Sequence, residues 1–131
     1  MTDISKLGEF GLIERLTKDV KSKNESTVYG AGDDCAVLAY PNSNVLVTTD
    51  MLRCEAAMVN ISDRCAMNGT PRQMVVSIAL SKRFCVEDMD EFYSGLRMAC
   101  DKWGVDIVGG DTTSSYTGLA ISITCIGEVL P

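Results

Sequence analysis

Apolar residues recur along the chain with two periods, and these periods predict its secondary structure. In residues 8–20 and 86–103 they return at about every third or fourth position, which is typical of an amphipathic helix. Residues 55–68 are apolar at nearly every position and predict a helix that is buried on most sides. Short apolar or alternating runs predict strands, at residues 35–40, 45–50, 74–80, 105–108 and 119–126.

The order of these elements indicates the fold class. Helix, two strands, helix, strand, helix and two strands is the order of an α+β domain with a mixed sheet of four to five strands and helices packed on one face. Residues 21–27 are polar and predict a loop, and the turn residues 41–44 favour a hairpin between the first two strands. Gly104 is placed to cap the last helix, whose acidic start suits the positive end of the helix dipole.

Composition and charge narrow the class of protein. A chain of 131 residues with 46% hydrophobic residues fits one domain with an ordinary core. The formal net charge of −6, with scattered basic residues, argues against a nucleic-acid partner. Six widely spaced cysteines and no histidine argue against a zinc site and favour a reduced, cytoplasmic protein. No stretch approaches the roughly 20 apolar residues of a membrane span, and no leader pattern opens the chain, so we expect a soluble, unsecreted protein.

The stretch 108–115 begins at the last residue of a predicted strand and reads Val-Gly-Gly-Asp-Thr-Thr-Ser-Ser. Glycines allow a backbone turn to approach a phosphate closely, and a carboxylate beside them can hold a metal ion. On its own, the same composition also describes an ordinary turn. The stretch becomes informative only together with other acidic residues.

Aspartates recur at the ends of the predicted strands. Asp33 and Asp34 precede the first strand, Asp50 ends the second and Asp111 follows the fourth. Carboxylates that converge on one place repel each other unless cations lie between them, and Mg²⁺ prefers carboxylate oxygens and bridges to substrate phosphates. The pattern therefore predicts a magnesium site completed by a polyphosphate ligand.

Asp63 lies in the otherwise apolar helix predicted at residues 55–68. A carboxylate with so little access to water must be paired or must bind a cation. The sequence alone does not decide whether Asp63 forms a salt bridge to Arg64 or Arg72 or binds a metal ion.

Signatures of other nucleotide sites and of nucleophilic catalysis are missing. The chain has neither a P-loop nor a complete dinucleotide fingerprint, and without histidine it has no Ser/His/Asp or Cys/His arrangement. Metal ions would therefore have to carry the phosphate charge, and we assign no catalytic side chain.

Six short motifs stand out along the chain. They are Gly-Glu-Phe-Gly-Leu-Ile at 8–13, Gly-Asp-Asp-Cys-Ala-Val at 32–37, Val-Thr-Thr-Asp-Met at 47–51, Val-Asn-Ile-Ser-Asp at 59–63, Ala-Met-Asn-Gly-Thr-Pro at 66–71 and Val-Gly-Gly-Asp-Thr at 108–112. These motifs occur in the order found in thiamine-monophosphate kinases, and the chain resembles that family over essentially its whole length. The individual motifs are shared with aminoimidazole ribonucleotide synthetase and selenophosphate synthetase, whereas Gly-Glu-Phe and Thr-Thr-Asp-Met favour the kinases.

The resemblance implies the N-terminal domain of the aminoimidazole ribonucleotide synthetase-like fold and ATP-dependent phosphorylation of thiamine monophosphate to thiamine diphosphate. It implies several Mg²⁺ ions, ATP as co-substrate and no covalent enzyme intermediate, in agreement with the dependence of phosphoryl transfer on positioning and charge neutralisation. The residues that match metal positions are Asp33, Asp34, Thr48, Thr49, Asp50, Asp63 and Asp111, and those that match nucleotide positions are Gly109, Gly110, Asp111, Thr112 and Tyr93.

The chain departs from the family pattern in two places. Between Arg53 and Cys54 the family has a longer connection with a substrate-contacting histidine, so we expect about 20 residues to be absent here. The family also continues into a C-terminal domain, which would follow Pro131. The resemblance therefore implies that this chain is the ATP- and magnesium-binding domain, inactive alone, and that it pairs through its sheet into a homodimer.

Two other functions stay open on the sequence alone. Another ATP-using synthetase of the same superfamily would share the fold and the motifs. A stand-alone nucleotide-binding dimerisation domain is favoured if the gene ends at Pro131.

Overall fold

The computed structural model describes residues 1–32, 35–52 and 68–131, with the backbone alone at residues 50–52. Asp33, Asp34 and Asp63 lie outside the described residues, as does almost all of the helix predicted at residues 55–68. The described elements are η1 (Ile4–Lys6), α1 (Gly8–Thr17), β1 (Thr27–Tyr29), β2 (Val37–Leu38), β3 (Asn44–Leu52), β4 (Thr70–Leu80), α3 (Val86–Trp103), β5 (Asp106–Ser114) and β6 (Leu119–Val129).

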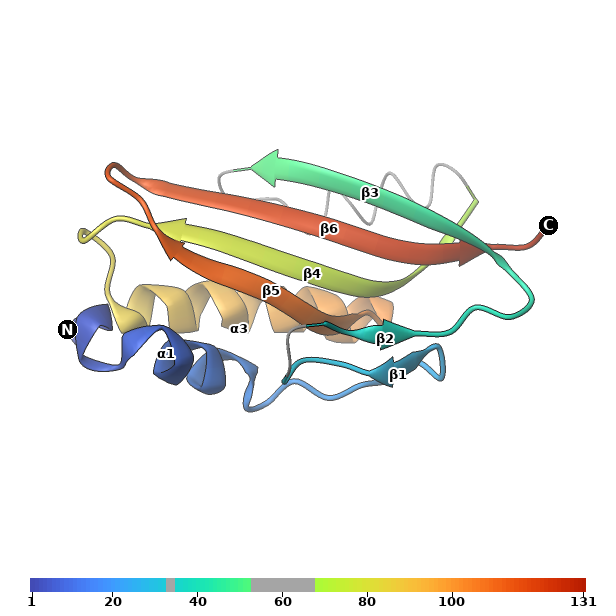
Figure 1. Ribbon diagram of the computed structural model, residues 1–131, viewed down its shortest axis with the longest axis horizontal. Coiled ribbons are helices and arrows are strands. Elements are labelled where there is room, and N and C mark those ends of the chain that lie inside the picture. The colour runs from blue at the N-terminus through green and yellow to red at the C-terminus, as the bar shows by residue number, and fades with distance from the viewer. Residues whose placement is uncertain (33–34, 53–67) are drawn as a thin grey trace.

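The main sheet is mixed and carries its helices on one face. Its strand order is β3-β6-β4-β5, in which β4 and β5 run parallel and the other pairs run antiparallel. Figure 1 shows α1 and α3 together on one side of this sheet, so the described part of the molecule has two layers. The predicted α+β fold, with a mixed sheet and helices on one face, is confirmed. A separate ribbon formed by β1 and β2, the β1–β2 ribbon, lies beside the start of β5.

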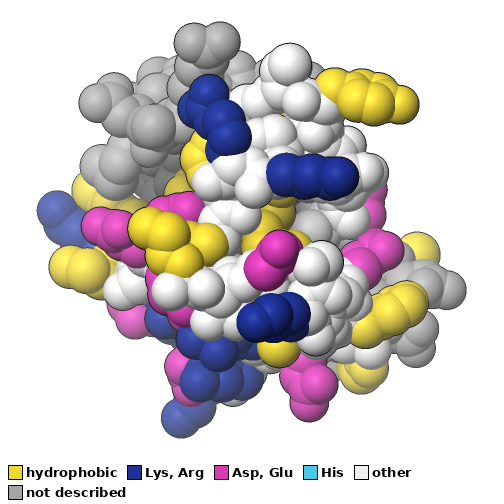
Figure 2. Space-filling model, turned by 90° about the vertical axis from the view of Figure 1, so that its left-hand side faces the viewer, with side chains coloured by type: hydrophobic (Ala, Val, Ile, Leu, Met, Phe, Trp, Pro, Cys, Tyr) yellow, Lys and Arg dark blue, Asp and Glu magenta, His cyan; other side chains and the backbone are white. Residues whose placement is uncertain are grey.

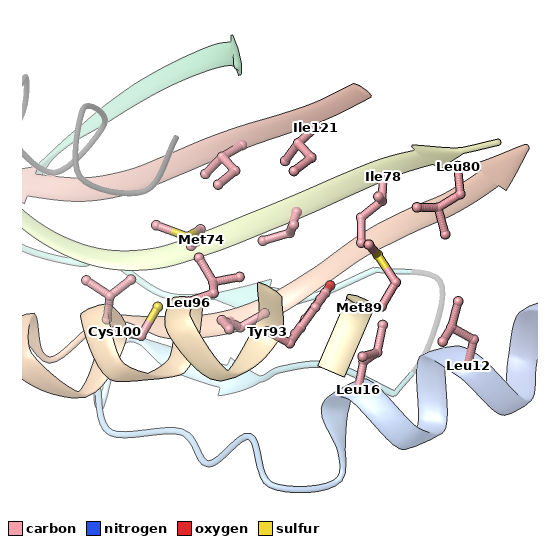
Figure 3. Close-up of a cluster of buried hydrophobic side chains, with 14 of the residues drawn as sticks. Leu12, Leu16, Met74, Ile78, Leu80, Met89, Tyr93, Leu96, Cys100 and Ile121 are labelled. Atoms are coloured by element: carbon pink, nitrogen blue, oxygen red, sulfur yellow. The ribbon is translucent and has the colours of Figure 1, made fainter. Parts of the chain in front are cut away.

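The core lies between the sheet and the two helices. Residues of β6 alternate between buried and more exposed positions, as predicted, with Ile121, Ile123 and Cys125 buried. Helix α3 buries residues at intervals of three or four, so its predicted amphipathic pattern is also confirmed. Each fully buried large apolar side chain contributes roughly 1.5–3 kcal/mol to folding. Figure 3 shows the side chains that meet there, among them Leu12, Leu16, Met74, Ile78, Leu80, Met89, Tyr93, Leu96, Cys100 and Ile121.

The described cysteines are mostly core residues, as predicted. Cys85, Cys100 and Cys125 are buried, whereas Cys35 is exposed. Burial raises the pKa of the Cys100 thiol to about 12, so this side chain stays protonated and unreactive near neutral pH.

Helix α3 begins and ends where its sequence predicts. The Asp88 carboxylate accepts a hydrogen bond from the Cys85 backbone N–H at 2.8 Å, which satisfies a backbone donor at the start of the helix. Gly104 ends the helix with a φ of 66°, a left-handed conformation that glycine adopts without strain. None of the described helices is long and apolar enough to cross a membrane.

The hairpin predicted between residues 35–40 and 45–50 is wrong. Strand β2 has only two residues and pairs with β1, whereas β3 pairs along its whole length with β6. A two-residue strand offers too few backbone partners for a strand of nine residues, and β6 offers one for each. A long-range pairing therefore replaces the local one, and the polar segment 21–27 leads into β1.

The stretch 108–115 was expected to follow a strand as a turn, and this is also wrong. Nearly all of it belongs to β5, which pairs in parallel with β4. An irregularity in the pairing leaves Val108 as an extra residue. Beyond it the strands approach so closely that a Cβ added to Gly110 would overlap the Val76 carbonyl oxygen. The backbone hydrogen bonds supplied by β4 extend the strand through residues whose composition indicates a turn, and Gly110 permits that contact.

We predict that Gly110→Ala destabilises the fold by at least about 2 kcal/mol, because the added methyl group overlaps the β4 backbone. Gly95→Ala is the matched control, since within the described part of the chain a Cβ at that position of α3 meets nothing within 4 Å. The control change should stabilise the protein by about 0.5–1 kcal/mol, because glycine is unfavourable inside a helix. Urea unfolding measures both effects, and a Gly110→Ala variant as stable as the parent protein would contradict the proposed contact.

Candidate functional site

Four of the five predicted nucleotide residues, Gly109, Gly110, Asp111 and Thr112, lie on β5, an outer strand of the described sheet. Asp111 is exposed and stands opposite Ser77 of β4, which in turn stands opposite Ser122 of β6. The neighbours of Ser77 along β4, Val76 and Ile78, belong to the core, so this row lies on the face of the sheet away from the helices. That face, called the open face below, carries a line of oxygen-bearing side chains.

The two predicted threonine ligands on β3 lie on opposite faces of the sheet. Thr49 belongs to the open face, where its hydroxyl accepts a hydrogen bond from the Thr124 hydroxyl at 2.9 Å. Thr48 stands opposite Cys125, which is fully buried on the helix-facing side. Because side chains alternate along a strand, a metal ion on the open face can use the hydroxyl of Thr49 but not that of Thr48.

Asp50 and Asp111 stand on the two outer strands of the described sheet. The pairing places the Asp50 backbone in one row with Ile123, Val76 and Gly110, next to Asp111. Three strand spacings separate the ends of this row, which makes about 14 Å. Two fully extended aspartate side chains with Mg²⁺ between them, at about 2.1 Å from each oxygen, reach only about 11 Å. Within one copy of the chain, Asp50 and Asp111 therefore cannot hold the same ion.

Magnesium fits the donors of the open face, because carboxylate and hydroxyl oxygens are ligands that it prefers. Among the described residues, no group of three or more His, Cys, Asp or Glu side chains could hold a metal ion. The side chains of Asp33, Asp34, Asp50 and Asp63 are not part of the described structure. The metal ligand set therefore stays a prediction, with Asp111 exposed on β5.

Tyr93, a predicted nucleotide contact, lies in the core. It is 6% exposed, and its ring meets that of Phe92 edge-on with 5.6 Å between the centroids. Burial raises the pKa of its hydroxyl to about 12. Figure 3 shows it between α3 and the sheet. The described structure gives this ring a packing role and adds no support for its nucleotide contact.

A buried polar network at the start of β5 was not predicted from the sequence. Asp106 is fully buried, and its carboxylate accepts hydrogen bonds from the backbone N–H groups of Lys23 at 2.5 Å and Asn24 at 3.0 Å. The Thr27 hydroxyl donates to the same carboxylate at 2.6 Å. The sequence did carry a signal, because an aspartate inside the apolar run 105–108 implies a buried carboxylate with hydrogen-bond partners.

The polar network continues to β4 through Gln73, which is also fully buried. Its side-chain N–H₂ group donates to the hydroxyls of Ser26 and Thr27, each at 2.8 Å. The Tyr40 hydroxyl donates to the side-chain oxygen of Gln73, and burial raises the pKa of Tyr40. The polar network thus links residues on both sides of the β1–β2 ribbon to the main sheet.

Arg72, one of the alternative partners considered for Asp63, is already paired. Its guanidinium lies 2.6 Å from a Glu128 carboxylate oxygen and donates to the side-chain oxygen of Asn24 at 3.2 Å. The hydrogen bond from Arg72 lowers the pKa of Glu128, whose other oxygen accepts from Ser43 at 2.9 Å. A salt bridge from Asp63 to Arg72 would have to share or displace this pair.

Two hollows on the surface of the described residues lie away from the predicted nucleotide residues. A hollow of about 310 Å³ lies beside Arg72, Glu128 and Leu130, and a wider one of about 560 Å³ lies beside Lys18, Lys21 and Asp101. Neither is lined by residues 109–112. Figure 2, which shows the end of the molecule where α1 begins, has basic, acidic and hydrophobic side chains interspersed. The candidate nucleotide site therefore rests on the residues of β5 and not on a cavity.

Known proteins resemble this chain in both sequence and structure. The chain is 31% identical over 140 aligned positions to the thiamine-monophosphate kinase of Aquifex aeolicus, covering 95% of this chain and 44% of the relative. The structure of AaThiL complexed with AMPPCP and TMP matches 99% of this chain and 45% of that one, with a TM-score of 0.63 and 29% identity. Hydrogenase maturation protein HypE matches 88% of this chain and 40% of its own, with a TM-score of 0.71 but 18% identity, which shows the fold alone.

The chain spans less than half the length of the relatives that it matches. Its similarity to thiamine-monophosphate kinases confirms the resemblance inferred from the motifs. The family model of the AIR synthase related protein, N-terminal domain, matches residues 32–129, from just before β2 to the end of β6. This chain therefore belongs to the family of AIR synthase related protein N-terminal domains.

Proposed function

We propose that the protein transfers a phosphoryl group from ATP to thiamine monophosphate, directly and with the help of Mg²⁺, to give thiamine diphosphate. The observation that carries this proposal is the 31% identity to a thiamine-monophosphate kinase over 95% of this chain. AaThiL, which was solved with AMPPCP and TMP, supports both substrates, since AMPPCP is an analogue of ATP. The exposed Asp111 on β5 offers a carboxylate where the motif requires one.

The positions of the predicted ligands imply that more than one Mg²⁺ ion binds. Asp111 and Thr49 face open solvent from different strands, and Asp50 stands too far from Asp111 to share an ion with it in one copy of the chain. When bound, Mg²⁺ neutralises phosphate charge during the transfer. Gly109 keeps the open face of β5 free of a side chain beside the phosphates. Gly110 and Thr112 stand opposite the core residues Val76 and Ile78, so their backbone would make the nucleotide contact. The remaining predicted metal ligands are Asp33, Asp34, Asp63 and, through its backbone, Thr48.

This chain would be the ATP- and magnesium-binding domain of a longer, cytoplasmic enzyme. A match of 95% of 131 residues fills about 124 of the 140 positions aligned with the Aquifex protein, so that relative has about 16 residues with no counterpart here. This difference supports a missing connection between Arg53 and Cys54. The 44% coverage of the relative supports a further domain, without which we expect no activity.

The open face also has an apolar end that suits a second copy of the chain. Val45 and Val47 on β3 are 49% and 65% exposed, and Ile126 of β6 stands beside Val47. An apolar surface favours association on a sheet whose outer strands each have a single neighbour in the described structure, and identical copies associate most simply as a closed pair. We therefore place the homodimer contact at this end of the open face.

The kinase activity is tested with the complete gene product, ATP, Mg²⁺ and thiamine monophosphate, followed by mass spectrometry of the products. We expect thiamine diphosphate, and none once Mg²⁺ is chelated, because the chain offers no cationic side-chain motif for the phosphates. A gene product that binds Mg²⁺-ATP but forms no thiamine diphosphate would show that thiamine monophosphate is not the substrate. It would favour another ATP-using reaction of the superfamily.

The metal ligands are tested separately from the reaction. Asp111→Asn and Asp63→Asn should each weaken Mg²⁺-dependent ATP binding roughly tenfold or more, because each removes a charged oxygen ligand. Asp101→Asn changes an exposed aspartate on α3 and serves as the control. Calorimetry measures the affinities and thermal unfolding confirms that the variants fold. ATP affinity that is indifferent to both changes would disprove the predicted roles of Asp111 and Asp63 as metal ligands.

The dimer contact is tested by charge. Val47→Lys should raise the dissociation constant of the homodimer at least about tenfold, because it places a cation in an apolar contact. Val28→Lys is the matched control, since Val28 is 63% exposed on the β1–β2 ribbon, outside the proposed contact. Analytical ultracentrifugation of the complete gene product measures both constants. Equal dissociation of the two variants would place the contact elsewhere.

A further inference from the structure

The β1–β2 ribbon is too small to hold its place by apolar packing. Its strands have three and two residues, and Val28 and Val37 are 63% and 50% exposed. An isolated ribbon of two strands is marginally stable in water at best. Contacts other than an apolar core of its own must therefore fix it to the main sheet.

The polar network provides such contacts on both sides of the ribbon. Asp106 bonds to the backbone just before the ribbon and to Thr27, its first residue. Gln73 bonds to Thr27 on one side and to Tyr40, two residues after β2, on the other. Asp106 and Gln73 are both fully buried, so removing one partner leaves a buried polar group unsatisfied.

The charge of Asp106 suits its partners. A carboxylate has only acceptor sites, and here it accepts from two backbone N–H groups and one hydroxyl. Such bonds to an ionised acceptor are about twice as strong as bonds between neutral groups. Asparagine has the same shape but would turn a donor toward at least one of these donors.

The segment that follows β1 lies against the strand that carries the predicted nucleotide residues. A Cβ added to Gly30 would lie 3.9 Å from a methyl carbon of Val108 and 3.3 Å from the hydroxyl of Ser22. Val108 immediately precedes Gly109 and Gly110. A displacement of the β1–β2 ribbon would therefore move backbone that lies beside β5, next to the candidate nucleotide site.

We propose that Asp106 is a positioning residue of the ATP site, which acts through Thr27 to hold the β1–β2 ribbon and the Gly30 backbone in place beside Val108. This inference rests on the proposed function, because it takes Gly109 and its neighbours as the residues that approach the ATP phosphates. On this view the polar network sets the shape of the site in addition to completing the fold.

The test is a calorimetric titration of the complete gene product with Mg²⁺-ATP. Thr27→Val keeps the side-chain shape but removes the hydroxyl between Asp106 and Gln73, whereas Thr27→Ser keeps the hydroxyl. We expect Thr27→Val and Asp106→Asn to weaken binding at least about fivefold, the effect of one net hydrogen bond, and Thr27→Ser to bind like the parent protein. Asp101→Asn should also bind like the parent, since Asp101 contacts the same loop only through an exposed pair with Lys23 at 3.0 Å.

The possible results separate the inference from the proposed function. A folded Thr27→Val variant with unchanged Mg²⁺-ATP affinity and only a lower unfolding midpoint overturns the inference, because the polar network is then purely structural. A parent protein that does not bind Mg²⁺-ATP overturns the proposed function and the inference with it. If circular dichroism shows that Asp106→Asn does not fold, the comparison of the two Thr27 variants decides.

Discussion

Strand β4 is paired on both sides, in parallel with β5 and antiparallel with β6, and the rest of the described structure depends on this double pairing. A parallel neighbour requires a long connection, and α3 makes it across the face on which β4 presents Met74, Val76 and Ile78. That face becomes the core. The opposite face is left without a helix in the described structure, and it is there that Asp111 and the exposed valines of β3 lie.

The parts of the fold that could be predicted have local causes. The limits of α3 follow from Asp88 and Gly104, and the buried face of β6 follows from strict alternation. The errors concern partners that are distant in sequence. The predicted hairpin is wrong because β3 pairs with a strand more than 60 residues away in the sequence. The predicted turn after Val108 is wrong because β4 supplies backbone hydrogen bonds that the composition of the stretch does not reveal. The burial of Asp106 could have been predicted, since one aspartate in an apolar run implies a buried carboxylate with hydrogen-bond partners.

The candidate site was predictable as a set of residues but not as an arrangement. The order of the motifs indicates that Asp50 and Asp111 both serve the site, whereas the sheet register places them on opposite outer strands. Likewise, Thr48 and Thr49 are adjacent in the motif but face opposite sides of the sheet. Strand alternation and strand order decide which ligands can share an ion, and only alternation can be deduced from one sequence.

Different physical constraints explain the two glycines of the Gly-Gly-Asp motif, although the sequence alone does not distinguish them. Gly110 is required by the sheet itself, because a Cβ there would overlap the β4 backbone before any ligand is bound. A Cβ at Gly109 would meet no atom of the described residues within 4 Å, and Gly109 does not have a positive φ. The described fold therefore gives no reason for glycine at position 109. The close approach of a ligand to the backbone is the remaining physical reason for a missing side chain, which makes Gly109 a stronger indicator of a phosphate contact than Gly110.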